Sequence, residues 1–140
     1  MLRNFLLLGL GFLLFTSCDE KFNCEDFKLG SPFVLKPGKL YQDCPGQLSI
    51  TMLRVESDSR CPANANCVWE GNAEVVFIFR NGDEETEFTM DTNASMRSSE
   101  NEKEVLGYYF ILNKLSPYPD TSFEIKQKDY RAEVIITKII

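Results

Sequence analysis

Residues 57–71 constrain the fold more than any other stretch of the chain, because they hold two of its five cysteines and its only tryptophan. Their sequence is Ser-Asp-Ser-Arg-Cys-Pro-Ala-Asn-Ala-Asn-Cys-Val-Trp-Glu-Gly. The residues between Cys61 and Cys67 favour tight turns, and a disulfide across so short a loop is sterically feasible. Such a bridge would remove about 2.4 kcal/mol of conformational entropy from the unfolded chain. The flanking runs are strand-like, so we expect a disulfide-closed loop between two strands.

This loop has two interpretations. In the first it is structural, and Trp69, which shares a face with Cys67 in an extended strand, packs on the sulfur atoms. In the second it is a binding loop whose polar and aromatic side chains face a ligand, namely Asp58, Arg60, Asn64, Asn66, Trp69 and Glu70. The oxygen-bearing members of that set would also suit calcium, although they lack the spacing of an EF-hand loop. Arg60 has a structural alternative, in which it pairs with Asp58, with Glu70 or with a carbonyl of its own turn.

The N-terminus has the pattern of an export signal. Arg3 precedes an apolar run, residues 5–15, that is too short to span a bilayer comfortably. Small residues stand directly before Cys18, and this resembles the lipobox of bacterial lipoproteins, with Phe15 where leucine is usual. The resemblance implies cleavage before Cys18 and acylation of its thiol and new amino group. An ordinary signal peptide with a chance cysteine is the alternative.

The cysteine count agrees with a lipid anchor. Five cysteines are an odd number for an exported protein, and lipidation of Cys18 leaves an even set. Their pairing is open from sequence alone, but the short spacing favours Cys61–Cys67, which leaves Cys24–Cys44. Disulfides imply an oxidising compartment. The spacing lacks a C-x-x-C pattern and is not typical of a redox or metal site, so we expect no metal ligands and no cofactor.

The sequence also indicates a location and excludes several functions. The acidic residues after Cys18 resemble sorting signals that bring some bacterial lipoproteins to the cell surface. We therefore expect a protein of the bacterial cell envelope, anchored in the outer membrane on its periplasmic or surface face. A net charge of −6 without a basic run argues against nucleic acid as a partner. Because the chain has no histidine, catalysis by imidazole is excluded, and no nucleophile motif is visible, so we do not expect an enzyme.

The body of the chain has the pattern of a β protein, in which short apolar runs alternate with turn signals. The alternation along residues 48–52 shifts by one residue at Leu53, which predicts a β-bulge near Met52. Further strands are expected over 105–112, around Phe123 and Ile125, and over 130–139, whereas 91–104 is polar and predicts a long loop. This spacing is typical of an antiparallel β-sandwich, immunoglobulin-like or related, with a small barrel as the alternative. The predicted divisions are a lipoprotein signal peptide (1–17), a short membrane tether (18–31) and a single β domain (32–140).

The strongest predicted pair of strands is a hairpin after residue 73. Residues 73–80 are apolar and β-branched or aromatic at most positions, and Asn81-Gly82 is a strong hairpin signal. A two-residue turn at that dipeptide would pair Arg80 with Asp83 and Val75 with Phe88. The apolar side chains of both strands would then share one face.

The cysteine segment also resembles a known group of proteins. The runs Asp-Ser-Arg-Cys-Pro at 58–62 and Cys-Val-Trp-Glu-Gly at 67–71 resemble the core of small bacterial secreted and lipoprotein domains of unknown function. In those domains a Tyr-x-Phe-x-Leu run leads to Leu-x-Pro-x-Pro, which residues 108–112 and 115–119 match. The resemblance covers about residues 33–138. It implies a compact extracytoplasmic β domain and no established activity, and the Cys24–Cys44 pair lies partly outside it.

These observations predict a lipid-anchored cell-envelope protein that acts as a non-catalytic partner-binding or structural module. The alternative is a glycan- or calcium-binding module that uses the 57–71 loop. Asp58, Arg60, Trp69 and Glu70 are the candidate binding residues. The expected partners are the membrane, through the lipid, and an envelope protein or a glycan. Trp69 could also stack on a sugar together with Tyr108, Tyr109 and Tyr118, although aromatic residues on separate strands more often form core and edge packing.

Overall fold

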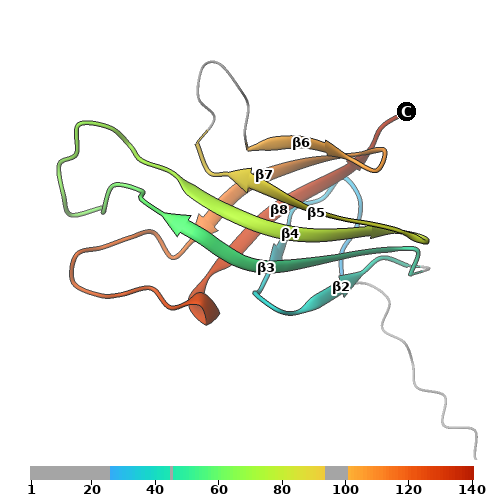
Figure 1. Cartoon of the computed structure of the whole chain (residues 1–140), viewed down its shortest axis with the longest axis horizontal. Coiled ribbons are helices and arrows are strands. Elements are labelled where there is room, and N and C mark those ends of the chain that lie inside the picture. Colours follow the sequence, from blue (N-terminus) through green and yellow to red (C-terminus); the bar gives the residue numbers. More distant parts are fainter. Residues whose placement is uncertain (1–25, 45, 94–100) are drawn as a thin grey trace, which may run out of the picture.

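The computed structural model describes residues 26–44, 46–93 and 101–140, and in this part the chain forms eight strands and one short 3-10 helix (Figure 1). The strands are β1 (Phe33–Leu35), β2 (Leu40–Gln42), β3 (Leu48–Asp58), β4 (Ala73–Asn81), β5 (Glu84–Asp91), β6 (Glu102–Val105), β7 (Tyr108–Ser116) and β8 (Arg131–Lys138). The 3-10 helix, η1 (Gln127–Asp129), precedes β8. None of the described residues belongs to a helix long and apolar enough to cross a membrane.

The strands form two antiparallel sheets of four strands each that pack face to face. One sheet has the order β1-β8-β7-β6, and the other has the order β2-β3-β4-β5. We call them sheet A and sheet B. The prediction of an antiparallel β-sandwich is confirmed, and the alternative of a small closed barrel is wrong.

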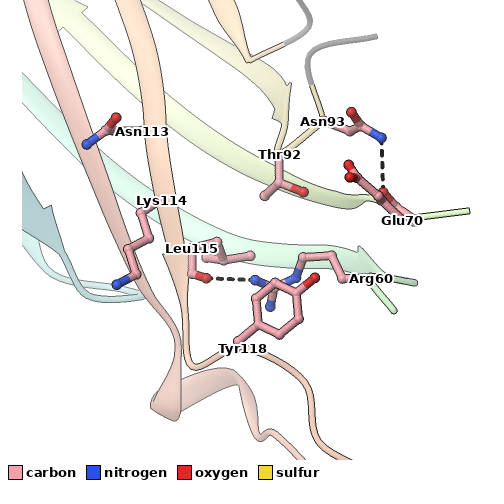
Figure 2. Close-up of a pocket in the computed structure, with 9 residues that line it drawn as sticks. Arg60, Glu70, Thr92, Asn93, Asn113, Lys114, Leu115 and Tyr118 are labelled. Carbon is pink, nitrogen blue, oxygen red and sulfur yellow. Dashed lines mark hydrogen bonds between the residues drawn. The ribbon is translucent and has the colours of Figure 1, made fainter. Parts of the chain in front are cut away.

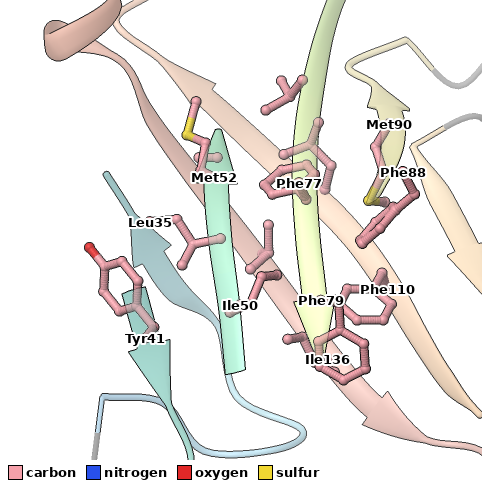
Figure 3. Close-up of a cluster of buried hydrophobic side chains, with 14 of the residues drawn as sticks. Leu35, Tyr41, Ile50, Met52, Phe77, Phe79, Phe88, Met90, Phe110 and Ile136 are labelled. Carbon is pink, nitrogen blue, oxygen red and sulfur yellow. The ribbon is translucent and has the colours of Figure 1, made fainter. Parts of the chain in front are cut away.

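Aromatic and branched side chains from both sheets fill the space between them (Figure 3). Phe79 of β4 meets Phe110 of β7 edge to face, with ring centroids 4.8 Å apart, and Phe88 of β5 approaches the same ring at 5.0 Å. Edge-to-face contacts place the positive rim of one ring on the negative face of the other. The largest fully buried side chains come from six of the strands: Leu35, Ile50, Met52, Val75, Phe77, Phe79, Met90, Phe110, Val134 and Ile136.

The predicted β-bulge is confirmed, because the pairing of β3 with β4 shifts between Met52 and Arg54. A second shift follows between Val55 and Ser57. At this second shift the backbone of Val55 has no strand partner on its outer side and is satisfied by Gln127 instead. The side-chain amide of Gln127 accepts from Val55 N at 3.0 Å and donates to Val55 O at 2.7 Å. A single residue of η1 thereby takes the place of a neighbouring strand.

The hairpin of β4 and β5 forms, but its predicted register is wrong by two residues. Arg80 lies opposite Glu85, and Val75 lies opposite Met90, so the turn residues are Gly82 and Asp83. Gly82 has a φ of 60°, and a glycine with positive φ at the first central position is the requirement of a type II′ turn. A slip of two residues keeps every side chain on its predicted face, because strands have a period of two.

Two other predicted segments differ in the structure. The run 105–112 is not one strand, because Leu106 and Gly107 have positive φ values of 49° and 79° and form a turn between β6 and β7. Residues 102–104, which were expected in the polar loop, are therefore part of the edge strand β6. The alternation at Phe123 and Ile125 does not form a strand, and Phe123 is half exposed.

Residues before 32 also pack against the sandwich. Phe27 is 6% exposed and stacks on Phe33, with ring centroids 4.7 Å apart. Gly30 N donates to Ile136 O at 2.8 Å. The last residues assigned to the tether, from 27 on, therefore pack against the sandwich, because an aromatic ring there completes the core. The signal peptide and the start of the tether lie outside the described residues.

Candidate functional site

The start of the described chain and two long connections lie at opposite ends of the sandwich (Figure 1). Asp26 accepts a hydrogen bond from Gln42 N, so the described chain starts at the end where β3 begins. The connection of β3 to β4, residues 59–72, lies at the opposite end, and the connection of β7 to η1, residues 117–126, lies beside it. We call these two connections the tip. β3 has 11 residues and separates the two ends by about 33 Å.

The predicted disulfide closes the first connection of the tip. Cys61 and Cys67 are bonded, with their Cα atoms 5.9 Å apart, which confirms this pairing. Cys44 is also disulfide-bonded. Its predicted partner Cys24 lies outside the described residues, as does the predicted lipid site Cys18.

Arg60 is a structural residue, 7% exposed, at the base of the tip. Its guanidinium donates to both carboxylate oxygens of Asp58, at 2.8 and 2.6 Å. It also donates to the carbonyls of Leu115 at 2.6 Å and Pro117 at 3.0 Å, and its outer side lies 5.1 Å from the ring centroid of Tyr118. The structure therefore shows the pairing of Arg60 with Asp58, one of the structural alternatives, and leaves little of this side chain for a ligand.

The same carboxylate also binds Tyr130, whose hydroxyl donates to Asp58 Oδ2 at 3.0 Å. Burial raises the pKa of Asp58, but the hydrogen bonds and charge of Arg60, with the Tyr130 hydroxyl, outweigh burial and hold this pKa below 3.8. Burial first, and then the negative charge of Asp58, raise the pKa of Tyr130 to about 12. Both shifts favour the protonation states that form this network at neutral pH.

The two connections of the tip are joined by Asn64. Its side-chain nitrogen donates to Asp120 at 3.0 Å and to Thr121 at 2.7 Å, and its side-chain oxygen accepts from Thr121 N at 3.0 Å. The backbone adds a bond of 2.9 Å from Ala63 N to Pro119 O. The connection of β3 to β4 is therefore held in one position by contacts with the connection of β7 to η1, as well as by its own disulfide.

Trp69 projects from this fixed loop into solvent. It is 79% exposed, and the neighbouring Val68 is fully exposed. The interpretation in which the ring packs on the sulfur atoms and joins the core is therefore wrong. Trp69 instead borders a shallow hollow of about 280 Å³, which Cys61 and Cys67 also line.

The structure does not arrange the four residues considered for calcium, Asp58, Asn64, Asn66 and Glu70, as ligands of one ion. Both oxygens of Asp58 are engaged by Arg60 and Tyr130, and the oxygen of Asn64 accepts from Thr121 N. In the described ranges, no group of three or more His, Cys, Asp or Glu side chains could hold a metal ion. The positions of Asp58 and Asn64 thus have structural explanations of their own.

A second hollow of about 260 Å³ lies at the base of the tip, between the two connections and the end of β5 (Figure 2). Arg60 and Leu115 form part of its wall, and the half-exposed ring of Tyr118 lies over Arg60. Its remaining lining residues are mostly polar: Glu70, Gly71, Thr92, Asn93, Asn113 and Lys114. Among the described residues, the carboxylate of Glu70 and the ammonium of Lys114 have no hydrogen-bond or ion-pair partner.

The polar wall of this hollow is fixed by a side-chain hub. The Asn72 side-chain oxygen accepts from Thr92 N at 3.0 Å, from the Thr92 hydroxyl at 3.2 Å and from Asn93 N at 3.2 Å. Asn93 donates in turn to Gly71 O at 3.2 Å. Gly71 has a φ of 72°, and a Cβ atom on it would lie 1.9 Å from Ser59 O, so no other residue fits there. The loop and the end of β5 are therefore locked together.

Sequence reasoning found part of this site. Of the candidate residues, Glu70 lines both hollows, while Trp69 and Arg60 line one each. Asp58 lies behind Arg60 and holds it in place. Tyr118 was considered only as one of several tyrosines that could stack on a sugar together with Trp69, and the contribution of Asn93 was not predicted. The match of 115–119 to a motif also marked the region of Tyr118, and nothing marked Asn93.

Comparison with known proteins gives no match to a family model, to a curated protein or to a solved structure.

Proposed function

We propose that this protein is a non-catalytic binding module of the bacterial cell envelope, held to the outer membrane by a lipid on Cys18, and that it binds its partner with the tip. The observation that carries this proposal is the exposed indole of Trp69 on a loop that a disulfide and Asn64 hold in place. A large apolar ring fixed in water gains free energy when a partner covers it, and it loses little conformational entropy on binding. Such rings are typical anchors of binding surfaces.

The geometry of the chain supports this orientation. Asp26 lies at the end of the sandwich opposite the tip, so a tether that starts at Cys18 reaches the domain from the far side. The segment from Cys18 to Asp26 can span at most about 28 Å. A lipid at Cys18 would therefore keep the body of the domain near the membrane and direct the tip away from it.

The chemistry of the tip supports binding over catalysis. Two carboxyl groups at or beside the tip have lowered pKa values. Asp120 accepts hydrogen bonds from Ser122 and Asn64. Asp58 is hydrogen-bonded on both oxygens and lies behind Arg60. It is not placed to exchange a proton with a substrate. The side chains that do face solvent, Trp69 and Glu70, suit contact with a partner.

The proposal is tested by crosslinking the full chain in a bacterial host that processes lipoproteins. The variant is Trp69→Ala, and Leu40→Ala is the matched control, because Leu40 is an exposed apolar residue on β2, away from the tip. We expect one defined crosslinked species in the wild type and in Leu40→Ala, and its loss in Trp69→Ala. A crosslinking pattern that is the same in all three proteins contradicts binding through the tip. Arg60→Ala is unsuited to this test, because Arg60 is buried.

The anchor is tested separately by Cys18→Ala. We expect the wild type in the membrane fraction and the variant in the soluble fraction. A variant that still sediments with membranes would rule out the lipid at this residue.

A further inference from the structure

We propose that the tip binds a neutral oligosaccharide, with one sugar ring on Tyr118, the next on Trp69, and the carboxylate of Glu70 between them. This inference rests on the proposed binding function and names its ligand. It starts from the two hollows of the tip, which have similar volumes of about 260 and 280 Å³. Each contains one exposed aromatic ring, and Glu70 lines both, so the hollows are neighbours that share a wall.

The aromatic rings present faces of the right kind. A sugar ring has one face of C–H groups and a rim of hydroxyls, and its C–H groups are attracted to the negative face of an aromatic ring. The Arg60 guanidinium lies against one side of the Tyr118 ring, at 5.1 Å from its centroid, and the ring is 51% exposed. The side away from Arg60 is therefore open, and Figure 2 shows the ring in front of the arginine. Trp69, at 79% exposed, has open surface as well.

The polar groups match the hydroxyl rim of a sugar. The Glu70 carboxylate can accept bonds from two hydroxyls, and the Lys114 ammonium at the other side of the hollow can donate. The amide nitrogen of Asn93 is held by Gly71 O, which fixes the direction of its side-chain oxygen. A mainly polar hollow with one aromatic wall orients a ligand through a few placed hydrogen bonds.

The charges favour a neutral ligand. Glu70 and Lys114 carry opposite charges on the walls of the same hollow, and the charge of Arg60 is balanced by Asp58 at 2.6 Å. A charged ligand would be attracted by one of these two side chains and repelled by the other, so its charge would add little binding free energy. A peptide is the less suitable ligand, because an anchor side chain needs an apolar recess, and Leu115 is the only aliphatic residue that lines the first hollow.

Contacts within the protein hold the site in place without a ligand. The disulfide, the Asn64 bonds and the Asn72 hub fix the loop, and Gly71 allows it to approach Ser59 closely. The loop therefore loses little conformational entropy when a ligand binds. This small cost favours the binding of ligands that make weak contacts, such as sugars.

The chain carries its own probe for this site. Trp69 is the only tryptophan, so the tryptophan fluorescence of the full-length protein in detergent reports on the second hollow alone. The experiment titrates the protein with neutral hexose and N-acetylhexosamine oligomers of increasing length. We expect a saturable change in fluorescence, with tighter binding for oligomers of two or more rings than for the monosaccharide.

The variants are Tyr118→Leu, which removes the stacking face in the first hollow, and Glu70→Gln, which removes the shared carboxylate. Each is expected to weaken binding about tenfold or more, which corresponds to about 1.4 kcal/mol or more. Phe123→Leu is the matched control, because Phe123 is a half-exposed aromatic of the same connection that lines neither hollow. It should leave the affinity unchanged.

Two outcomes would overturn the inference. One is a sugar affinity that Tyr118→Leu and Glu70→Gln leave at the wild-type value. The other is the absence of a response to every oligomer while Trp69→Ala still abolishes the crosslinked species, which would show a protein partner at the tip. In that second case the proposed binding function stands, so the two failures are distinguishable.

Discussion

The hydroxyl of Tyr130 donates to Asp58 Oδ2 across 3.0 Å and so connects the residue before β8, in sheet A, with the last residue of β3, in sheet B. The same carboxylate accepts hydrogen bonds from Nε and Nη2 of Arg60. Three side chains thus join the two sheets and the tip at one buried point. The position of the tip depends on this network. The contribution of each of the three side chains can therefore be measured as a change in the free energy of unfolding.

Tyr130→Phe removes one bond of this network. We expect the free energy of unfolding to fall by about 1 kcal/mol at neutral pH. The pKa of Tyr130 is raised from 10.0 to about 12 in the folded protein, so its contribution is complete below pH 10 and is lost as the pH rises towards 12. The difference between wild type and variant should therefore shrink over this range. Urea unfolding at neutral and at alkaline pH measures it, and a constant difference would contradict the role of this hydroxyl.

Arg60→Ala leaves the Asp58 carboxylate buried without its counter-charge. We expect a loss of about 3–5 kcal/mol in the free energy of unfolding, as for other broken buried pairs. The matched control is Arg54→Ala, because Arg54 pairs with Glu56 at the surface, where both side chains are about half exposed. That variant should lose less than about 1 kcal/mol. Similar values for both variants, from urea unfolding, would show that the Arg60 network does not stabilise the fold.

The network also predicts a dependence on acid. Because the pKa of Asp58 is lowered in the folded protein, its stabilising contribution is present above pH 3.8 and is lost as the pH falls below that value. Asp58→Asn should therefore differ from the wild type at neutral pH and approach it in strong acid. Thermal unfolding followed by circular dichroism across this range checks the prediction. A gap that widens in acid would contradict the assignment.

Gly71→Ala tests the close packing of the loop. The new Cβ would lie 1.9 Å from Ser59 O and would also force alanine to a φ of 72°. Gly38→Ala is the matched control, because Gly38 has a φ of 74° with no atom within 4 Å of its added Cβ. We expect about 1 kcal/mol of destabilisation for Gly38→Ala, from backbone strain alone, and at least about 2 kcal/mol for Gly71→Ala. Equal losses in urea unfolding would mean that the loop can move away from Ser59.

Trp69→Ala separates the two interpretations of the tryptophan in solution. Since the ring is 79% exposed, its removal should change the free energy of unfolding by no more than about 0.5 kcal/mol. A buried ring would lose about 3–5 kcal/mol. Fluorescence is lost with the tryptophan, so circular dichroism is the measurement. A large loss of stability would place the ring in the core.

The fold was largely predictable because its signals are periodic. The alternation of apolar residues over 48–55 predicted β3 and its bulge. The apolar run after residue 73, with its turn signal, predicted the hairpin of β4 and β5. Its register was not predictable, because Asn81-Gly82 and Gly82-Asp83 both suit tight turns and a slip of two residues leaves the faces unchanged. The split at Leu106 was missed because Val105 and Leu106 continue the apolar run of β7, while the first three residues of β6 are charged and resemble the polar loop before them.

The site was less predictable than the fold. The local spacing of Cys61 and Cys67 predicts their bond, and the nearness of Asp58 to Arg60 predicts a pair. The exposure of Trp69 depends on where the loop turns after leaving the disulfide, which side-chain periodicity does not determine. Asn93 and Tyr118 reach the hollow through connections of different sheets, and only the tertiary structure brings them to Glu70.

The order of sheet A has a consequence for how the protein is made. β1, the first strand, pairs only with β8, the last, through contacts such as Phe33 with Val134, and β8 lies between β1 and β7. Until β8 has been synthesised, β1 has no strand to pair with and sheet A lacks an interior strand. Under the proposed export of this chain, the strand order would keep the domain from completing its fold before β8 is available, and a truncation just before Arg131 would remove an interior strand of sheet A.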